Sequence, residues 1–124
     1  MANLEFQDDP NLPLQTARAG DWSVVRVTEV SLMDAAVIDR LSAAVAGRVE
    51  SGEKNLVLDM SEVEYISSSA VGFLVEINQH VSRAKGQLVL AGLNDRLAEL
   101  LKITKLDKMF KREKTLGDAM QRLK

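Results

Sequence analysis

The sequence predicts an α/β domain in which about four helices pack on a mixed sheet of about four to five strands. Two short apolar runs, at residues 56–58 and 88–90, have the character of strands covered on both faces. Segments with apolar residues at helical spacing lie before and after each run. Strands and helices that alternate in this way form a mostly parallel sheet shielded by helices, and 124 residues suit one such domain.

The first half of the predicted domain begins with a hairpin. Residues 14–18 and 22–27 have the pattern of two strands, and the Gly20-Asp21 pair between them suits a tight turn. Apolar residues then recur near the helical period over 33–50, which predicts an amphipathic helix. The strand at 56–58 follows directly, so the chain passes from an antiparallel pair to parallel pairing.

The second half repeats the alternation. A helix is expected over 68–85, followed by the strand at 88–90 and a shorter helix over 94–104. A weak strand signal covers 108–110, and a last amphipathic helix is expected over 115–123. The predicted order is therefore β-β-α-β-α-β-α-(β)-α.

Residues 1–13 differ in composition from the rest of the chain. They are mostly polar and contain Pro10 and Pro13, which disfavour regular structure. We predict a flexible N-terminal extension, either a mobile lead-in or an addition to the sheet edge, and place the domain itself at 14–124.

Composition removes several classes of function. The chain has no cysteine and His80 is its single histidine, so thiolate and multi-histidine metal sites are excluded and no cofactor is expected. A net charge of −2 argues against direct binding of nucleic acid, and the basic stretch 102–114 is read as solvated surface rather than a binding patch. The absence of a long apolar run or a leader predicts a cytoplasmic protein without membrane insertion.

Three consecutive serines stand where a loop is expected to become a helix. Ser67 is our candidate for the N-cap, Ser68 is expected to face solvent, and Ser69 is expected to turn toward the sheet. A helix start one residue away would exchange the orientations of Ser68 and Ser69. Capping alone explains a serine here. A phosphate on Ser68 would also be favoured, because the unpaired N–H groups and the positive end of the helix dipole attract anions.

The segment from Leu58 to Gly72, LDMSEVEYISSSAVG, resembles the signature of the STAS family. In that signature a strand ending in Asp-Leu-Ser leads through a spacer to Asp-Ser-Ser-Gly-Leu-Gly at a helix start. Ser67 stands here in place of the family aspartate, and Ala70 in place of the glycine. The resemblance covers about residues 15 to 123 in element order and implies the STAS fold.

The resemblance implies a regulatory protein like the anti-sigma factor antagonists rather than an enzyme. In those proteins the first serine after the aspartate is phosphorylated by a protein-serine kinase that is also the anti-sigma factor, and a phosphatase reverses the modification. By position that serine is Ser68, with Ser67 and Ser69 as alternatives. The chain is expected to be a monomer or a weak homodimer. The alternative is a STAS scaffold without phosphorylation, in a signalling assembly or a lipid-transport complex.

The partner-binding surface is expected at the helix start and at the loop 28–34, which helps form the docking face in the family. The residues assigned to it are Ser67, Ser69, Ala70, Met33 and Asp34.

Acidic residues near the serines have simpler explanations than catalysis. Asp59 is expected to accept hydrogen bonds from the following loop at the strand end, while Glu62 and Glu64 are read as solvated loop acids without a basic partner. His80 is expected at the surface or half-buried in a helix. No nucleophile–base pair and no glycine-rich phosphate loop supports an enzyme.

Overall fold

The computed structural model describes residues 4–123, which form an α/β domain with four helices. Its main sheet has six strands in the order β1-β2-β3-β5-β7-β8. The helices are α1 (Ala35–Glu50), α2 (Ser68–Arg83), α3 (Asp95–Ile103) and α4 (Leu116–Arg122). The strands of the main sheet are β1 (Gln7–Asp8), β2 (Leu14–Ala19), β3 (Trp22–Val27), β5 (Asn55–Asp59), β7 (Gln87–Ala91) and β8 (Lys111–Glu113).

The sheet is mixed, as the sequence predicts. The strands β1, β2 and β3 pair antiparallel, whereas β3, β5, β7 and β8 are parallel. A second, small sheet pairs β4 (Ser31–Leu32) in parallel with β6 (Tyr65–Ile66). Strands of two residues are too short to show an alternating pattern, which explains why β1, β4 and β6 were not expected as strands.

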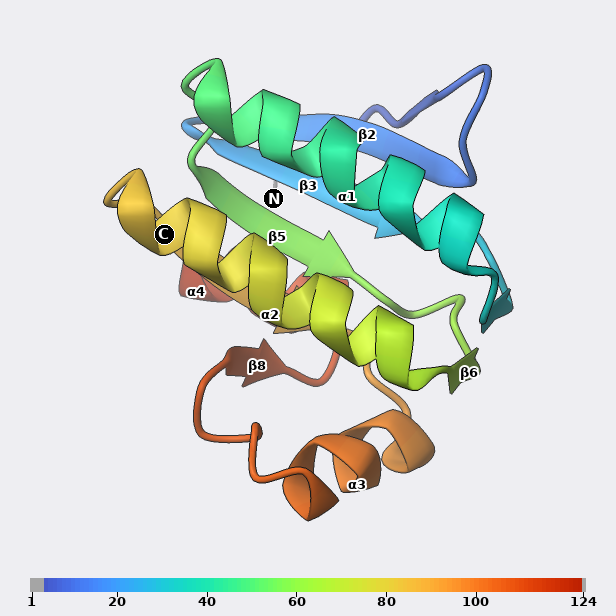
Figure 1. The fold of residues 1–124 in the computed structure, drawn as a ribbon. Coiled ribbons are helices and arrows are strands. Elements are labelled where there is room, and N and C mark those ends of the chain that lie inside the picture. The colour runs from blue at the N-terminus through green and yellow to red at the C-terminus, as the bar shows by residue number, and fades with distance from the viewer. Residues whose placement is uncertain (1–3, 124) are drawn as a thin grey trace.

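The two faces of the main sheet are covered differently (Figure 1). The helices α1 and α2 lie side by side over one face, and their inward side chains form the larger apolar core with Leu56, Leu58 and Leu90. The back face carries a smaller cluster that includes Val24, Val57 and Val89. The side chains of α4 and of the N-terminal segment at residues 4–6 cover this smaller cluster.

One predicted strand lies elsewhere. The sequence suggested 108–110, but β8 runs from Lys111 to Glu113. The N–H of Met109 donates to the carbonyl of Leu106, so this part of the chain is a turn. Pairing begins at Lys111, where the chain first runs alongside Val89 of β7.

The N-terminal residues add to the edge of the sheet. Gln7 pairs with Thr16 and Asp8 with Gln15, so residues before the predicted domain start belong to the main sheet. Of the two alternatives for this segment, the structure has the addition to the edge; its flexibility in solution stays a prediction. In the part of the chain that the structure describes, no helix has the length and apolar character needed to cross a bilayer.

Candidate functional site

The three serines lie at the end of the sheet where the parallel strands finish and the helices begin (Figure 1). The small sheet brings the two loops at this end together, with Ser31 opposite Tyr65 and Leu32 opposite Ile66. The N–H of Ser67 donates to the carbonyl of Leu32 at 3.2 Å. The start of α2 is therefore fixed by backbone bonds to the loop that leads into α1.

Ser67 is the N-cap of α2, as predicted. Its backbone is extended, with φ −93° and ψ 173°, and its Oγ accepts from the N–H of Ala70 at 3.3 Å. This contact satisfies one of the free N–H groups at the helix start. Ser68 is consequently the first helical residue, and it is exposed.

The two residues after Ser68 point in opposite directions. Ser69 is exposed, so the expectation that it turns toward the sheet is wrong. The register of the helix explains the difference, because Ala70 occupies the inward position and is fully buried. A protein docking on this surface would meet the hydroxyls of Ser68 and Ser69 but not the methyl of Ala70, which we had assigned to the partner-binding surface.

Apolar side chains are exposed at the same end of the molecule. Met33, Val30 and Tyr65 have between 45% and 54% of their surface exposed. Asp34 is also exposed, and its carboxylate caps α1 by accepting from the N–H groups of Ala36 and Val37. We call Val30, Met33, Asp34, Tyr65, Ser68 and Ser69 the serine face. Val30 and Tyr65 were not singled out from the sequence, since only the pairing of β4 with β6 brings Tyr65 next to the loop that carries Val30 and Met33.

An arginine borders the serine face. The guanidinium of Arg96, near the start of α3, lies 4.4 Å from the centre of the Tyr65 ring and donates to the carbonyl of Glu64 at 3.3 Å. The amide of Asn94 donates to the same carbonyl at 3.3 Å. These contacts join α3 to the loop before α2 and hold the ring of Tyr65 against Arg96.

Asp59 is buried at the beginning of the loop 60–67, which we call the switch loop. Its side chain is 0% exposed, and its Oδ2 accepts from Nε of Arg26 on β3 at 2.9 Å. Its Oδ1 accepts from the N–H of Ser61 at 3.1 Å, as expected for a structural residue at the strand end. Gly92 lies against this turn: a Cβ added there would approach Ser61 to 2.8 Å, so the close packing requires glycine.

The prediction that the loop acids have no basic neighbour is wrong for Glu62. Its Oε2 lies 3.9 Å from Nε of Arg26, the same group that pairs with Asp59. The parallel register places Arg26 opposite Asp59, which no spacing in the sequence indicates. A signal was present, because Arg26 is a charged residue in a strand whose other residues are apolar apart from Ser23.

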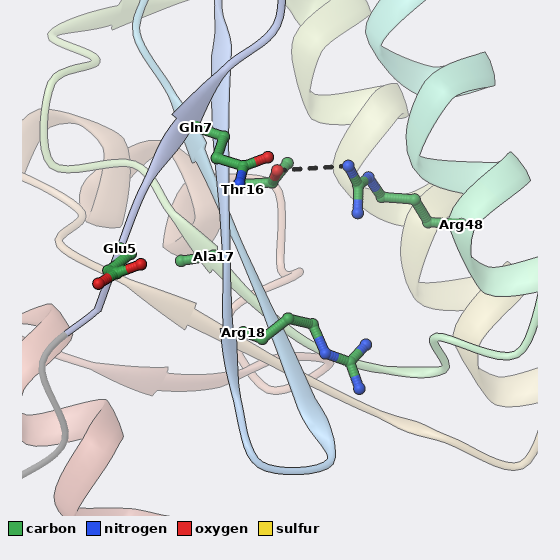
Figure 2. A pocket seen from close by; sticks show the side chains of 6 residues that line it. All are labelled: Glu5, Gln7, Thr16, Ala17, Arg18 and Arg48. Carbon is green, nitrogen blue, oxygen red and sulfur yellow. Dashed lines mark hydrogen bonds between the residues drawn. The ribbon is translucent and has the colours of Figure 1, made fainter.

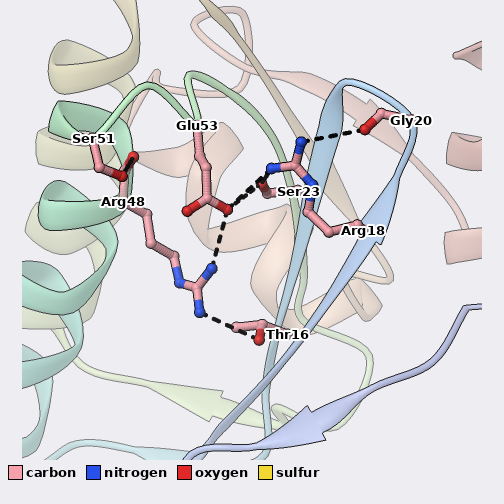
Figure 3. A network of polar contacts seen from close by, with 7 residues as sticks. All are labelled: Thr16, Arg18, Gly20, Ser23, Arg48, Ser51 and Glu53. Carbon is pink, nitrogen blue, oxygen red and sulfur yellow. Dashed lines mark hydrogen bonds and ion pairs between the residues drawn. The ribbon is translucent and has the colours of Figure 1, made fainter.

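A second polar network lies at the opposite end of the sheet (Figure 3). Oε1 of Glu53 accepts from Arg18, Ser23 and Arg48 at 2.8 to 3.2 Å, so it joins the hairpin to the last turn of α1. Burial by itself would raise the pKa of Glu53, but the hydrogen bond from Ser23 and the charges of Arg48 and Arg18 lower it below its usual value.

A hollow lies next to this network, between the N-terminal segment, β2 and α1 (Figure 2). It is lined by Glu5, Gln7, Thr16, Ala17, Arg18 and Arg48. Arg48 donates to Thr16 at 3.3 Å and to Glu53, so its charge is used in holding α1 against the hairpin. Between residues 4 and 123 no group of acidic and histidine side chains has the arrangement of a metal site.

Comparison with known proteins agrees with this fold. The model of the STAS domain family matches residues 14–119. Over 73 residues the chain is 29% identical to a protein of Bordetella bronchiseptica provisionally named anti-sigma factor antagonist BtrV. The match covers 59% of this chain and 63% of that protein, so the matched stretch is less than two thirds of the relative.

Solved structures share the arrangement of strands and helices. An anti-sigma-factor antagonist (STAS) domain protein from Planctomyces limnophilus has a TM-score of 0.79 at 16% identity, covering 89% of this chain and 97% of that one. The anti-sigma factor antagonist SpoIIAA in its unphosphorylated form has a TM-score of 0.73 at 14% identity, covering 89% and 95%. Its phosphorylated form gives 0.69 at 12% identity, covering 98% and 100%. Identities this low speak for the fold alone.

The family match extends over most of the chain, and the mixed sheet with helices at these positions is the fold of the similar structures. The chain therefore belongs to the STAS domain family.

Proposed function

We propose that the protein is a regulatory module whose serine face binds a protein-serine kinase that also acts as an anti-sigma factor, and that phosphorylation of Ser68 weakens this binding. A phosphatase restores the unmodified form. The module works in the cytoplasm as a binding protein rather than as an enzyme. The observation that carries the proposal is an exposed Ser68 at a helix start, with exposed apolar side chains on the two loops that meet there.

The position of Ser68 supports its role as the phosphate acceptor. Because Ser67 holds the cap, the hydroxyl of Ser68 is not needed to complete the helix. It is exposed at the first turn, where free N–H groups and the helix dipole stabilise an added anion. Ser69 is also exposed but lies one residue further into the helix.

The surroundings of Ser68 support a change in binding on phosphorylation. Met33 and Tyr65 offer exposed apolar surface of the kind that partners bury. Asp34, Glu62 and Glu64 are exposed carboxylates on the loops beside it. A phosphate adds about −1.5 to −2 charges at neutral pH. The phosphorylated serine face would then repel an acidic surface of a partner. A partner that packs closely against it would also have to bury the charged phosphate, which costs desolvation free energy.

The relatives support the same proposal. The similar protein of Bordetella bronchiseptica carries the name of an anti-sigma factor antagonist, and SpoIIAA is known in unphosphorylated and phosphorylated forms. These names describe those proteins. They extend to this chain through the shared fold and the exposed serine at the start of α2.

The test is phosphorylation by candidate protein-serine kinases from the source organism with ATP, followed by mass spectrometry. We expect phosphate on Ser68 in the parent protein and in Ser69→Ala, and none in Ser68→Ala. These two variants are matched, because both change an exposed hydroxyl in the same helical turn. A third variant, Ser67→Asp, tests the last of the three serines. It removes the hydroxyl of Ser67 but keeps an oxygen that can cap α2.

Binding to the same kinase is then measured by calorimetry for the parent protein and for Ser68→Asp. We expect at least about tenfold weaker binding of the variant, equivalent to about 1.4 kcal/mol. Phosphate found only on Ser69 would show that Ser69, and not Ser68, is the residue that is modified. Binding of a partner without phosphate on Ser67, Ser68 or Ser69 would contradict the switch and favour a scaffold in a signalling assembly or a lipid-transport complex.

A further inference from the structure

The switch loop is connected to the N-terminal segment by an unbroken series of side-chain contacts. The series starts at Phe6, which lies outside the residues matched by the family model. It passes through Arg26 to Asp59 and ends at the N–H of Ser61 in the switch loop. Three elements far apart in the sequence therefore meet on the back face of the sheet.

Phe6 contacts both apolar and charged groups. Its side chain packs against the back-face cluster, to which Val24 and Val57 belong. The guanidinium carbon of Arg26 lies 3.9 Å from the centre of the Phe6 ring. At this distance a ring face attracts a cation, and the same ring shields the guanidinium from water. Phe6 thus restricts both the position and the solvation of Arg26.

The segment that carries Phe6 is fixed at its other end by β1. Gln7 and Asp8 pair with β2, and the segment runs alongside that strand (Figure 2). The amide of Gln15 donates to Asp8 at 2.7 Å, and its carbonyl oxygen accepts from Arg26 at 3.4 Å. The N-terminal segment therefore reaches Arg26 in two ways, directly through the ring of Phe6 and indirectly through Asp8 and Gln15.

Arg26 is in turn the partner of the switch loop. Its Nε pairs with the fully buried Asp59 at 2.9 Å and lies 3.9 Å from Glu62. A buried carboxylate depends strongly on the placement of its counter-charge. A change in the position of Arg26 would therefore reach Asp59 and, through it, the turn at Ser61.

We infer that Phe6 is a positioning residue for the switch loop, acting through Arg26 and Asp59, so that the N-terminal segment controls how firmly the loop leading to Ser68 is held. A binding partner or a preceding length of chain that lifts Phe6 from the back face would loosen residues 60–67. The effect on regulation rests on the proposed function of Ser68. The role of Phe6 in positioning the switch loop does not depend on that function.

The N–H of Ser61 is a direct reporter, because it donates to Asp59. Amide hydrogen exchange of the full chain, followed residue by residue by NMR, would compare Ser61 with Val57 in the middle of β5. We expect Phe6→Leu, which keeps an apolar side chain but removes the ring, to speed exchange at Ser61 about fivefold relative to Val57. Phe6→Tyr keeps the ring and should retain slow exchange.

Leu4→Ala is the matched control. Leu4 packs against the same back-face cluster, so its truncation reports on lost apolar packing without removing the ring that faces Arg26. We expect the ratio of exchange at Ser61 to that at Val57 to stay within twofold of the parent value, as an order-of-magnitude limit. A second check introduces Phe6→Leu into the variant Arg26→Lys, which lacks the planar guanidinium. In that background Phe6→Leu should change the exchange rate at Ser61 less than it does in the parent protein.

The inference is overturned if Phe6→Leu leaves the ratio of Ser61 to Val57 unchanged, or if Leu4→Ala raises it as much as Phe6→Leu does. It is also overturned if Phe6→Tyr behaves like Phe6→Leu. None of these measurements uses a kinase or a phosphate. Failure of the positioning role is therefore distinguishable from failure of the proposed switch.

Discussion

The two ends of strand β5 are each joined to the β2–β3 hairpin by a carboxylate, but the carboxylates are held in different ways. At the amino end, Glu53 is 26% exposed and accepts from three side chains, on β2, β3 and α1. At the carboxyl end, Asp59 is 0% exposed and, within residues 4–123, has a single side-chain donor, Arg26. One junction has several donors and is partly exposed to solvent, whereas the other is buried and depends on one guanidinium.

We expect the end held by Glu53 to tolerate the loss of a contact and call it the scaffold end. We expect the end held by Asp59 to be sensitive to such a loss and call it the responsive end. Loss of one donor at Glu53 leaves two others in place, so its carboxylate keeps hydrogen-bond partners. Loss of Arg26 would leave the buried carboxyl group of Asp59 without its counter-charge. The sensitive junction lies at the end where the switch loop leads to Ser68. The following predictions test this contrast, from the largest expected effect to the smallest.

The largest effect is expected from Arg26→Met, which keeps an apolar stem and removes the charge. We expect the free energy of unfolding at neutral pH to fall by about 3–5 kcal/mol, because a buried carboxylate loses its partner. Urea denaturation followed by circular dichroism measures this change. The control is the double variant Arg26→Met with Asp59→Asn, which removes the buried charge while keeping an oxygen for the N–H of Ser61. It should be more stable than Arg26→Met alone; equal stabilities would show that Asp59 does not depend on the charge of Arg26.

A smaller effect is expected from Glu53→Gln. The free energy of unfolding should fall by about 1 kcal/mol near neutral pH, since the arginines around Glu53 are partly exposed. The pKa of Glu53 is lower in the folded protein than its usual value of 4.5, so its charge stabilises the fold above that pH. This contribution is lost as the pH falls through the lowered pKa.

The pH dependence supplies the check on this prediction. The difference in unfolding free energy between the parent and Glu53→Gln should shrink between about pH 7 and about pH 3, across the range where carboxylates titrate. Asp39→Asn, which removes an exposed carboxylate on α1, is measured over the same pH range as the control variant. A difference that grows on acidification would contradict the role assigned to the charge of Glu53.

The sequence predicted the scaffold better than the junctions. Continuous apolar runs such as Leu56–Leu58 indicate buried strands whatever their neighbours, and Ser67 was identified as a cap because capping depends on local chain geometry. Arg26 and Asp59 are 33 residues apart, and their contact depends on the register between β3 and β5. The position of Phe6 depends on a strand of two residues. The orientation of Ser69 was missed because neighbouring residues of one helical turn face in quite different directions.

The smallest effect concerns the surface of the responsive end. Ser68→Asp places a negative charge at the first turn of α2, where the helix dipole favours it, and Ser68 is exposed. We expect the free energy of unfolding to rise by about 0.5 kcal/mol, and Ser68→Lys to lower it by a similar amount. Urea denaturation at low and high salt measures both, and added salt should reduce the two changes because the interaction is screened. Strong destabilisation by Ser68→Asp would mean that a charge at Ser68 disturbs the fold itself. A small change would instead leave Ser68 free to carry a phosphate that alters docking without unfolding the module.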